Sequence, residues 1–205
     1  MNGQLFAGRV VWADIGGFTF ACGQDVAEIL RIGAFVTASA GEIQVVSAIT
    51  NIIWNSDDMA QQVARSKDIG DSLLSDQLWR RIGGPAIKCV VIGYLTGGKA
   101  YQSLPDRTVI SLSQISVMDA EQISEFVLHS DGYLVTILSS IEPQYQADIM
   151  ANHILYIYHT LNDSQRQEWI STAKRRVSKA MSQDPQNVLR FTQIMAAHQL
   201  ESSQT

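Results

Sequence analysis

Short runs of apolar and β-branched residues follow one another through the first half of the chain, with glycine-rich or polar turns between many of them. Several of these runs alternate large apolar side chains with small or polar ones, which is typical of a strand with one buried face. The runs lie at residues 8–12, 18–22, 34–38, 43–54, 86–94, 99–102, 109–112 and 115–118. A series of short strands separated by turns predicts a small closed barrel or a sandwich.

Two stretches interrupt this β-rich half. Residues 23–32 place Val26, Ile29 and Leu30 at helical spacing between flanking glycines, and this pattern fits a short helix or a loop. Residues 56–83 are polar, contain capping residues for helices and lead into a Gly-Gly-Pro stop signal. We therefore expect a helical insertion between two strands.

After residue 118 the spacing of the apolar residues becomes helical. Asp119 followed by Gln122 has the form of a capping box and predicts a helix that ends near His129. The next apolar run fits a helix or a strand by itself, and its helical neighbours favour a helix. Together the later helices are predicted at 133–141, 143–161, 162–181 and 186–200. We expect a barrel domain at 1–118 and a helical domain at 119–205.

The composition is that of a globular protein, with 46% hydrophobic and 17% charged residues. A net charge of −5 gives the chain no overall attraction to nucleic acid or to an anionic membrane. No run approaches the ~18 apolar residues of a membrane-spanning helix. The N-terminal residues also lack the basic and then apolar pattern of a secretory signal. We expect a cytoplasmic protein that does not insert into membranes.

A glycine-rich string is the one place where the sequence resembles a catalytic motif. From Gly93 to Lys99 it matches the first seven residues of the phosphate-loop pattern, but Ala100 replaces the hydroxyl residue that would hold magnesium. A phosphate loop must also open a helix, and a nearby proline would interrupt one here. We interpret Gly93, Gly97 and Gly98 as turn residues of a hairpin, with a degenerate nucleotide site as the alternative.

No other group of residues predicts a catalytic, cofactor or metal site. Cys22 and Cys89 lie in apolar runs and are expected to be buried, reduced thiols. All the histidines belong to the helical half and none stands at a metal-binding spacing, so we interpret each as a helix-face or partly buried residue. They are His129, His153, His159 and His198.

One basic cluster lies in the predicted helix at 162–181. It consists of Lys174, Arg175, Arg176 and Lys179, which spread over an arc of the helix away from its apolar stripe. Neither aromatic residues nor a known nucleic-acid motif accompanies the cluster. A solvated face is the favoured interpretation, and contact with an anion or an acidic partner is the alternative.

Taken together, the short motifs of the first half resemble the HAS barrel, the N-terminal β-barrel shared by HerA-type DNA-translocating ATPases and the ATP synthase α and β subunits. The resemblance covers roughly residues 5–118. It is carried by the strand openings at 8–11 and 31–37, the long strand at 43–52, the segment 91–95 and the Leu-Pro-Asp-Arg-Thr-Val turn at 104–109.

In that family the barrel is not catalytic and packs beside its neighbours in a hexameric ring, while a separate domain hydrolyses ATP. The resemblance therefore implies an oligomerisation or docking function without cofactor. With the helical pattern after residue 118, it predicts an α+β fold, a closed barrel of about six strands followed by a helical bundle. We expect a non-enzymatic protein that binds copies of itself or an unidentified protein partner. The alternatives are nucleotide binding at Gly93–Lys99 and a nucleic-acid accessory function through Lys174–Lys179.

Overall fold

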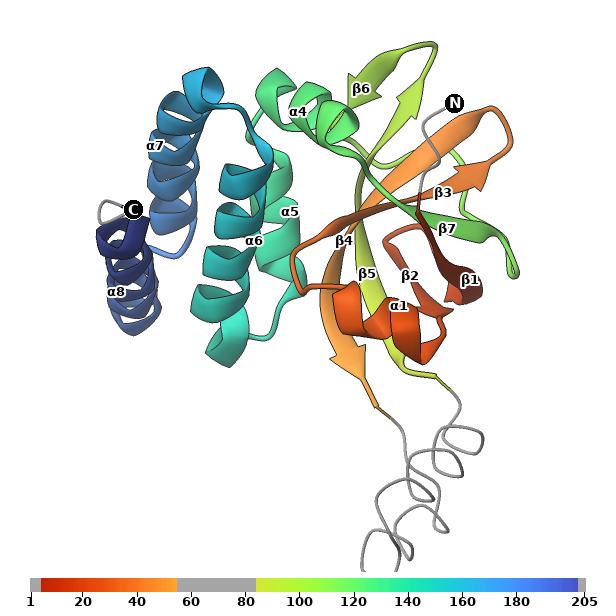
Figure 1. Ribbon diagram of the computed structural model, residues 1–205, viewed down its shortest axis with the longest axis horizontal. Helices are drawn as coiled ribbons and strands as arrows, with labels where there is room; N and C mark the ends of the chain where they lie inside the picture. Colours follow the sequence, from red (N-terminus) through yellow and green to blue (C-terminus); the bar gives the residue numbers. More distant parts are fainter. Residues whose placement is uncertain (1–4, 55–83, 203–205) are drawn as a thin grey trace, which may run out of the picture.

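The first half of the chain forms a closed antiparallel barrel in the computed structural model, which describes residues 5–54 and 84–202 (Figure 1). The strands pair in the order β2-β1-β7-β3-β4-β5-β6, and a further pairing of β2 with β5 closes six of them into a barrel. They are β1 (Phe6–Ala13), β2 (Gly17–Ala21), β3 (Phe35–Ala40), β4 (Ile43–Ile53), β5 (Ala86–Thr96), β6 (Lys99–Tyr101) and β7 (Gln114–Val117). The predicted closed barrel is confirmed.

The barrel interior is filled by alternate residues of its strands, as the period of two in a strand requires. Phe18 and Phe20 of β2, Ile49 of β4 and Ile87 of β5 are among its fully buried side chains. Cys22 and Cys89 belong to the same buried cluster and are free thiols, as expected.

The prediction of a strand at 109–112 is wrong. Ser113 N donates to Ile110 O (3.1 Å), so the chain turns there before β7 begins. The segment still runs beside β1, because Leu112 N donates to Val10 O (2.8 Å) and Val10 N donates to Ser113 O (3.0 Å). The ambiguous stretch before β3 contains the short helix α1 (Gln24–Ile29). The expected insertion at 56–83 lies outside the described residues.

Helices follow the barrel, as predicted. Asp119 and Gln122 form the expected capping box, with the Gln122 N–H donating to Asp119 Oδ1 (2.9 Å) and the Asp119 N–H donating to Gln122 Oε1 (3.3 Å). Pro143 begins a short 3₁₀ turn, η1 (Pro143–Tyr145), that leads into the central helix. The helices are α4 (Ala120–His129), α5 (Tyr133–Ser140), α6 (Gln146–Thr160), α7 (Asp163–Ala180) and α8 (Pro185–Ser202).

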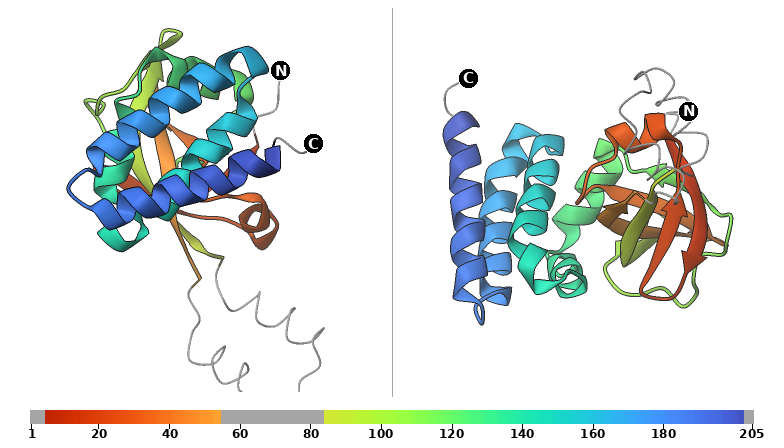
Figure 2. Two further views of the ribbon diagram at one scale, coloured as in Figure 1. Left: turned by 90° about the vertical axis from the view of Figure 1, so that its left-hand side faces the viewer. Right: turned by 90° about the horizontal axis from the view of Figure 1, so that it is seen from below.

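The helices all lie on one side of the barrel, from α5 next to it to α8 farthest away (Figures 1 and 2). The contact is made by side chains on the outside of β3, β4 and β5, including Phe35, Val46 and Ile92. These residues share a single buried cluster with Phe126 of α4 and Tyr133 of α5. The barrel and the helices are therefore joined by a continuous apolar core rather than by a loose linker.

The two halves approach each other closely at Gly33, in the loop between α1 and β3. Gly33 has φ +89°, and a Cβ atom added there would lie 2.7 Å from His153 Cα in α6. The carbonyl of Gly33 accepts a hydrogen bond from the Nδ1–H of His153 (2.6 Å). The absence of a side chain at Gly33 therefore allows the backbone of the loop to meet the backbone of α6.

Aromatic rings surround this contact. The Phe35 ring lies 5.1 Å from the His153 ring, 5.6 Å from the Tyr133 ring and 5.8 Å from the Phe126 ring, measured between centroids. Tilted and edge-to-face pairs at these distances are favourable. His153 is completely buried, and this burial lowers its pKa to about 4, although the hydrogen bond to Gly33 opposes the shift. We name His153 with Gly33 and the three rings the junction cluster.

Replacing Gly33 by Ala should destabilise the protein by about 3 kcal/mol, because the new methyl group meets both a left-handed backbone and the α6 backbone. Gly98→Ala is the matched control, since Gly98 also has positive φ (+71°) but nothing lies within 4 Å of an added Cβ. The control should cost only about 1–2 kcal/mol. Urea unfolding of both variants measures the difference. Equal losses would show that the close contact with α6 is not important.

His153 should make the protein less stable in mild acid. Between pH 6.5 and pH 4 the unfolded chain carries a proton on this residue and the folded chain does not. The contribution of the neutral imidazole is therefore complete above pH 6.5 and is lost as the pH falls toward 4, by about 3 kcal/mol in total.

Urea unfolding of the wild type and of His153→Asn at pH 7.5 and pH 4.5 measures this effect. Asparagine keeps an N–H donor near the Nδ1 position but does not titrate, so the pH dependence of the variant should be smaller. His129→Gln, at the exposed end of α4, is the control and should retain the wild-type dependence. A His153→Asn variant with the wild-type dependence would contradict the assignment.

Candidate functional site

Large apolar side chains are exposed on the part of the barrel that the helices do not cover. Three of them belong to β1 and two to the loop that runs beside it before β7. Figure 1 shows β1 and β7 on the side of the barrel opposite α6, α7 and α8. We call this group the β1 face; its residues and exposed fractions are Phe6 (49%), Val11 (54%), Trp12 (56%), Ile110 (73%) and Leu112 (68%).

The backbone at Leu112 is in an unusual conformation. Its φ of 68° lies in the left-handed region, and it is the only non-glycine residue with positive φ in the described parts of the chain. Such a conformation costs roughly 1–2 kcal/mol in a residue with a branched side chain. Hydrogen bonds hold it: Leu112 N donates to Val10 O, and Arg9 Nη1 donates to Leu112 O (2.9 Å). The structure thus holds a large, exposed apolar side chain at a strained position.

A cation lies within the β1 face. The Arg9 guanidinium stands 6.0 Å from the centroid of the Phe6 ring, within the range of a cation–π contact. With its hydrogen bond to the carbonyl of Leu112, Arg9 connects β1 to the neighbouring loop. Aromatic residues and arginine are enriched at protein interfaces, and Phe6, Trp12 and Arg9 supply them here. The β1 face is therefore a candidate protein-interaction surface.

The glycine-rich string forms a strand, a turn and a second strand. Gly97 (φ 55°) and Gly98 (φ 71°) occupy the two central positions between β5 and β6, as a two-residue hairpin turn requires. Across this hairpin the rings of Tyr94 and Tyr101 stack with centroids 5.0 Å apart. The turn opens no helix, so the backbone N–H groups of a phosphate cradle are not assembled.

The prediction that Gly93 is a turn residue is wrong. The residue lies inside β5, where a Cβ atom would approach Tyr101 O to 2.1 Å and the Phe126 ring to 3.0 Å. The glycine is needed because α4 and the hairpin strand β6 both pack closely against β5 at this point. Lys99 is exposed beside the turn, on a shallow groove of about 340 Å³ that Glu125 also lines. A carboxylate there disfavours a triphosphate.

The basic cluster is only partly free of other contacts. On α7, Arg175, Arg176 and Lys179 are exposed, while Lys174 is partly buried and desolvation lowers its pKa. Arg176 lies 3.8 Å from the carboxylate of Asp131. One of the four cations therefore faces a carboxylate and another turns toward the protein, which leaves little free charge for a phosphate backbone.

Three of the four histidines are exposed on helices, and the fourth is buried. His129 and His159 are exposed on α4 and α6, His198 is exposed on α8, and His153 is the buried member of the junction cluster. Within residues 5–54 and 84–202, no three side chains of His, Cys, Asp or Glu are grouped as metal ligands. Across the same residues, no helix combines the length and apolar character that crossing a bilayer requires.

No model of a known protein family matches the chain. No curated protein matches it significantly either. The likeness to the HAS barrel therefore stays a prediction, and the function has to be argued from the surface itself.

The sequence alone did not identify the β1 face. Val11 and Trp12 were correctly assigned to a strand, Phe6 lies before the strand predicted at 8–12, and the loop residues were assigned to a strand that does not form. One local signal was present: Val11 and Trp12 are adjacent large apolar residues, so in a regular strand one of them must point away from the barrel core. The register shift between Val10 and Trp12 leaves both exposed.

Because Leu112 is strained, a glycine substitution there should not lower the free energy of unfolding, as glycine substitutions ordinarily do. Leu112→Gly should leave the free energy of unfolding unchanged or raise it by about 0.5 kcal/mol, because relief of the left-handed strain offsets the added freedom of the unfolded chain. Leu189→Gly is the control, an equally exposed leucine (60%) inside α8, and should lose about 1 kcal/mol. Urea unfolding at low protein concentration measures both. A loss at Leu112 as large as that at Leu189 would show that no strain is stored there.

Proposed function

We propose that this protein is a non-enzymatic interaction module that associates with copies of itself through the β1 face. The observation that carries the proposal is the exposure of large apolar side chains from β1 and the adjacent loop, with Leu112 held there in a strained conformation. Exposed apolar side chains on adjacent segments of the surface favour an interaction site. Strain at an exposed residue is retained where the residue serves a function other than stability.

The mode of association follows from the closure of the barrel. Pairing of β2 with β5 engages the strand edges in hydrogen bonds, so another chain cannot extend the barrel there. The remaining edge belongs to β6, which has three residues and begins with the exposed Lys99. Short, charged edges resist strand addition. Packing of side chains on the β1 face is therefore the proposed contact.

The choice of a second copy as the partner rests on the resemblance to HAS barrels, which pack beside their neighbours in a ring. In this proposal the helices cover one side of the barrel, and the β1 face on the other side makes the lateral contact with the neighbouring copy. The proposed location is the cytoplasm, and the two free, buried cysteines support it. Nucleotide and nucleic-acid binding remain the alternatives, and neither the Gly93–Lys99 hairpin nor the Lys174–Lys179 cluster favours them.

The mass of the protein in solution tests this proposal. Light scattering after size-exclusion chromatography, from about 1 to about 100 µM, should show a mass above that of the 22.6 kDa chain that increases with concentration. Trp12→Glu should shift the protein toward monomer, because association would bury an unpaired carboxylate.

Leu189→Glu is the matched control for the association experiment. Leu189 is as exposed as Trp12, at 60% against 56%, but lies on α8 at the far side of the helical layer. This variant should keep the wild-type mass. A wild type that stays monomeric at every concentration would overturn the proposal, and so would a Trp12→Glu protein that associates like the wild type.

A further inference from the structure

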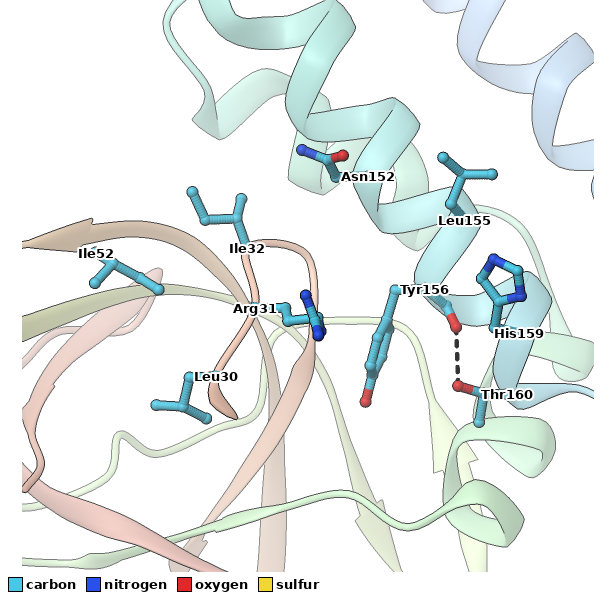
Figure 3. Close-up of a pocket in the computed structure, with 9 residues that line it drawn as sticks. All are labelled: Leu30, Arg31, Ile32, Ile52, Asn152, Leu155, Tyr156, His159 and Thr160. Atoms are coloured by element: carbon cyan, nitrogen blue, oxygen red, sulfur yellow. Dashed lines mark hydrogen bonds between the residues drawn. The ribbon is translucent and has the colours of Figure 1, made fainter. Parts of the chain in front are cut away.

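A concave site lies between the barrel and α6, away from the β1 face. It has a volume of about 730 Å³, which is within the range of small-molecule sites. One wall is the loop after α1 together with the end of β4, and the other wall is α6 (Figure 3). The lining residues are Leu30, Arg31, Ile32 and Ile52 from the barrel, and Asn152, Leu155, Tyr156, His159 and Thr160 from α6.

The walls combine an apolar surface with a few polar groups. Leu30, Ile32, Ile52 and Leu155 provide aliphatic side chains from both sides. The polar groups are a guanidinium, an imidazole, an amide and two hydroxyls, and no carboxylate is among the described residues that line the space. The cavity can therefore hold a molecule with an apolar body and a hydrogen-bonding or anionic head.

Arg31 is the cation of this site. Its carbonyl accepts a hydrogen bond from Ala34 N (3.1 Å), and two further bonds join the same loop to Ile49 of β4, so the backbone that carries Arg31 is fixed. Among the described residues, the ion pairs involve other arginines, namely Arg107, Arg166, Arg176 and Arg190. The Arg31 guanidinium is thus available to an external anion, and the described lining residues offer it no competing carboxylate.

Tyr156 is placed to assist it. Its ring packs against the apolar clusters of both the barrel and the helices, and Figure 3 shows it reaching from α6 toward the barrel. Burial raises the pKa of the phenol, so the hydroxyl stays protonated and can donate. Thr160 already donates its own hydroxyl hydrogen to the backbone carbonyl of Tyr156 (2.9 Å). The donors that remain are Arg31, the Tyr156 hydroxyl, Asn152 and His159, and of these Arg31 is the one that always carries a positive charge.

From this arrangement we infer that the cavity binds a small amphipathic carboxylate, with its head at Arg31 and Tyr156 and its aliphatic or ring body against Ile32, Ile52 and Leu155. A bidentate contact between guanidinium and carboxylate fixes the head, and the aliphatic walls exclude water from the body. The inference uses none of the residues of the β1 face, so it stands or falls separately from self-association.

Calorimetric titration of the full chain with octanoate tests the inference. Octanoate should bind with a dissociation constant below about 1 mM. Acetate, which has the head without the body, and octylammonium, which reverses the charge, should not bind in that range. If octanoate fails to bind, or if octylammonium binds equally well, the inference is overturned.

Variants then locate the binding. Arg31→Gln should weaken octanoate roughly ten-fold or more, and Tyr156→Phe should weaken it several-fold, while the melting temperature of Arg31→Gln stays at the wild-type value because Arg31 is exposed. Arg175→Gln, an exposed arginine of α7 that does not line the cavity, is the matched control and should bind like the wild type. Undiminished binding by Arg31→Gln would exclude this cavity as the site.

Discussion

The hydrogen bond from His153 to the carbonyl of Gly33 is the contact on which the relation between the two halves depends. It joins residues that are 120 positions apart in the chain and is buried on both sides. A donor and an acceptor in this position must satisfy each other, since no water reaches them. The contact in turn needs a glycine, because α6 approaches too closely for any side chain. Around it, Phe35 contributes the apolar surface that merges the barrel exterior with the helical core.

The packing around the junction cluster determines which surfaces of the barrel remain free. The helices pack on the exterior of β3, β4 and β5 through one continuous apolar cluster, so much of that side of the barrel is already covered. Closure of the barrel uses the hydrogen-bonding edges of β2 and β5. The exterior of β1 is the part that neither constraint reaches, and large apolar residues are exposed there. Self-association through the β1 face would therefore leave the contacts between the helices and the barrel in place.

Much of the architecture was predictable because its determinants are local. The capping box at Asp119 and the paired glycines at 97–98 each lie within a few residues of the groups they satisfy. The strand predicted at 109–112 shows where local signals fail. Its apolar residues fit a strand, but the segment makes only a few hydrogen bonds to β1 and turns at Ile110 before β7 begins. Neither the cavity nor the role of His153 has a local signal, because each needs residues that only the folded chain brings together.

The cavity between the barrel and α6 lies next to the junction cluster, and the same residues position both. Arg31 and Ile32 directly precede Gly33, while Asn152 and Tyr156 flank His153 on α6, so both walls of the cavity extend from the same close contact. At Gly33 the loop meets the backbone of α6. The cavity opens next to this contact and is lined by side chains of the loop and of α6. A contact this tight fixes the distance between the walls before any ligand arrives. Preorganisation of that kind reduces the entropy cost of binding, which allows a few polar groups to select a small anion.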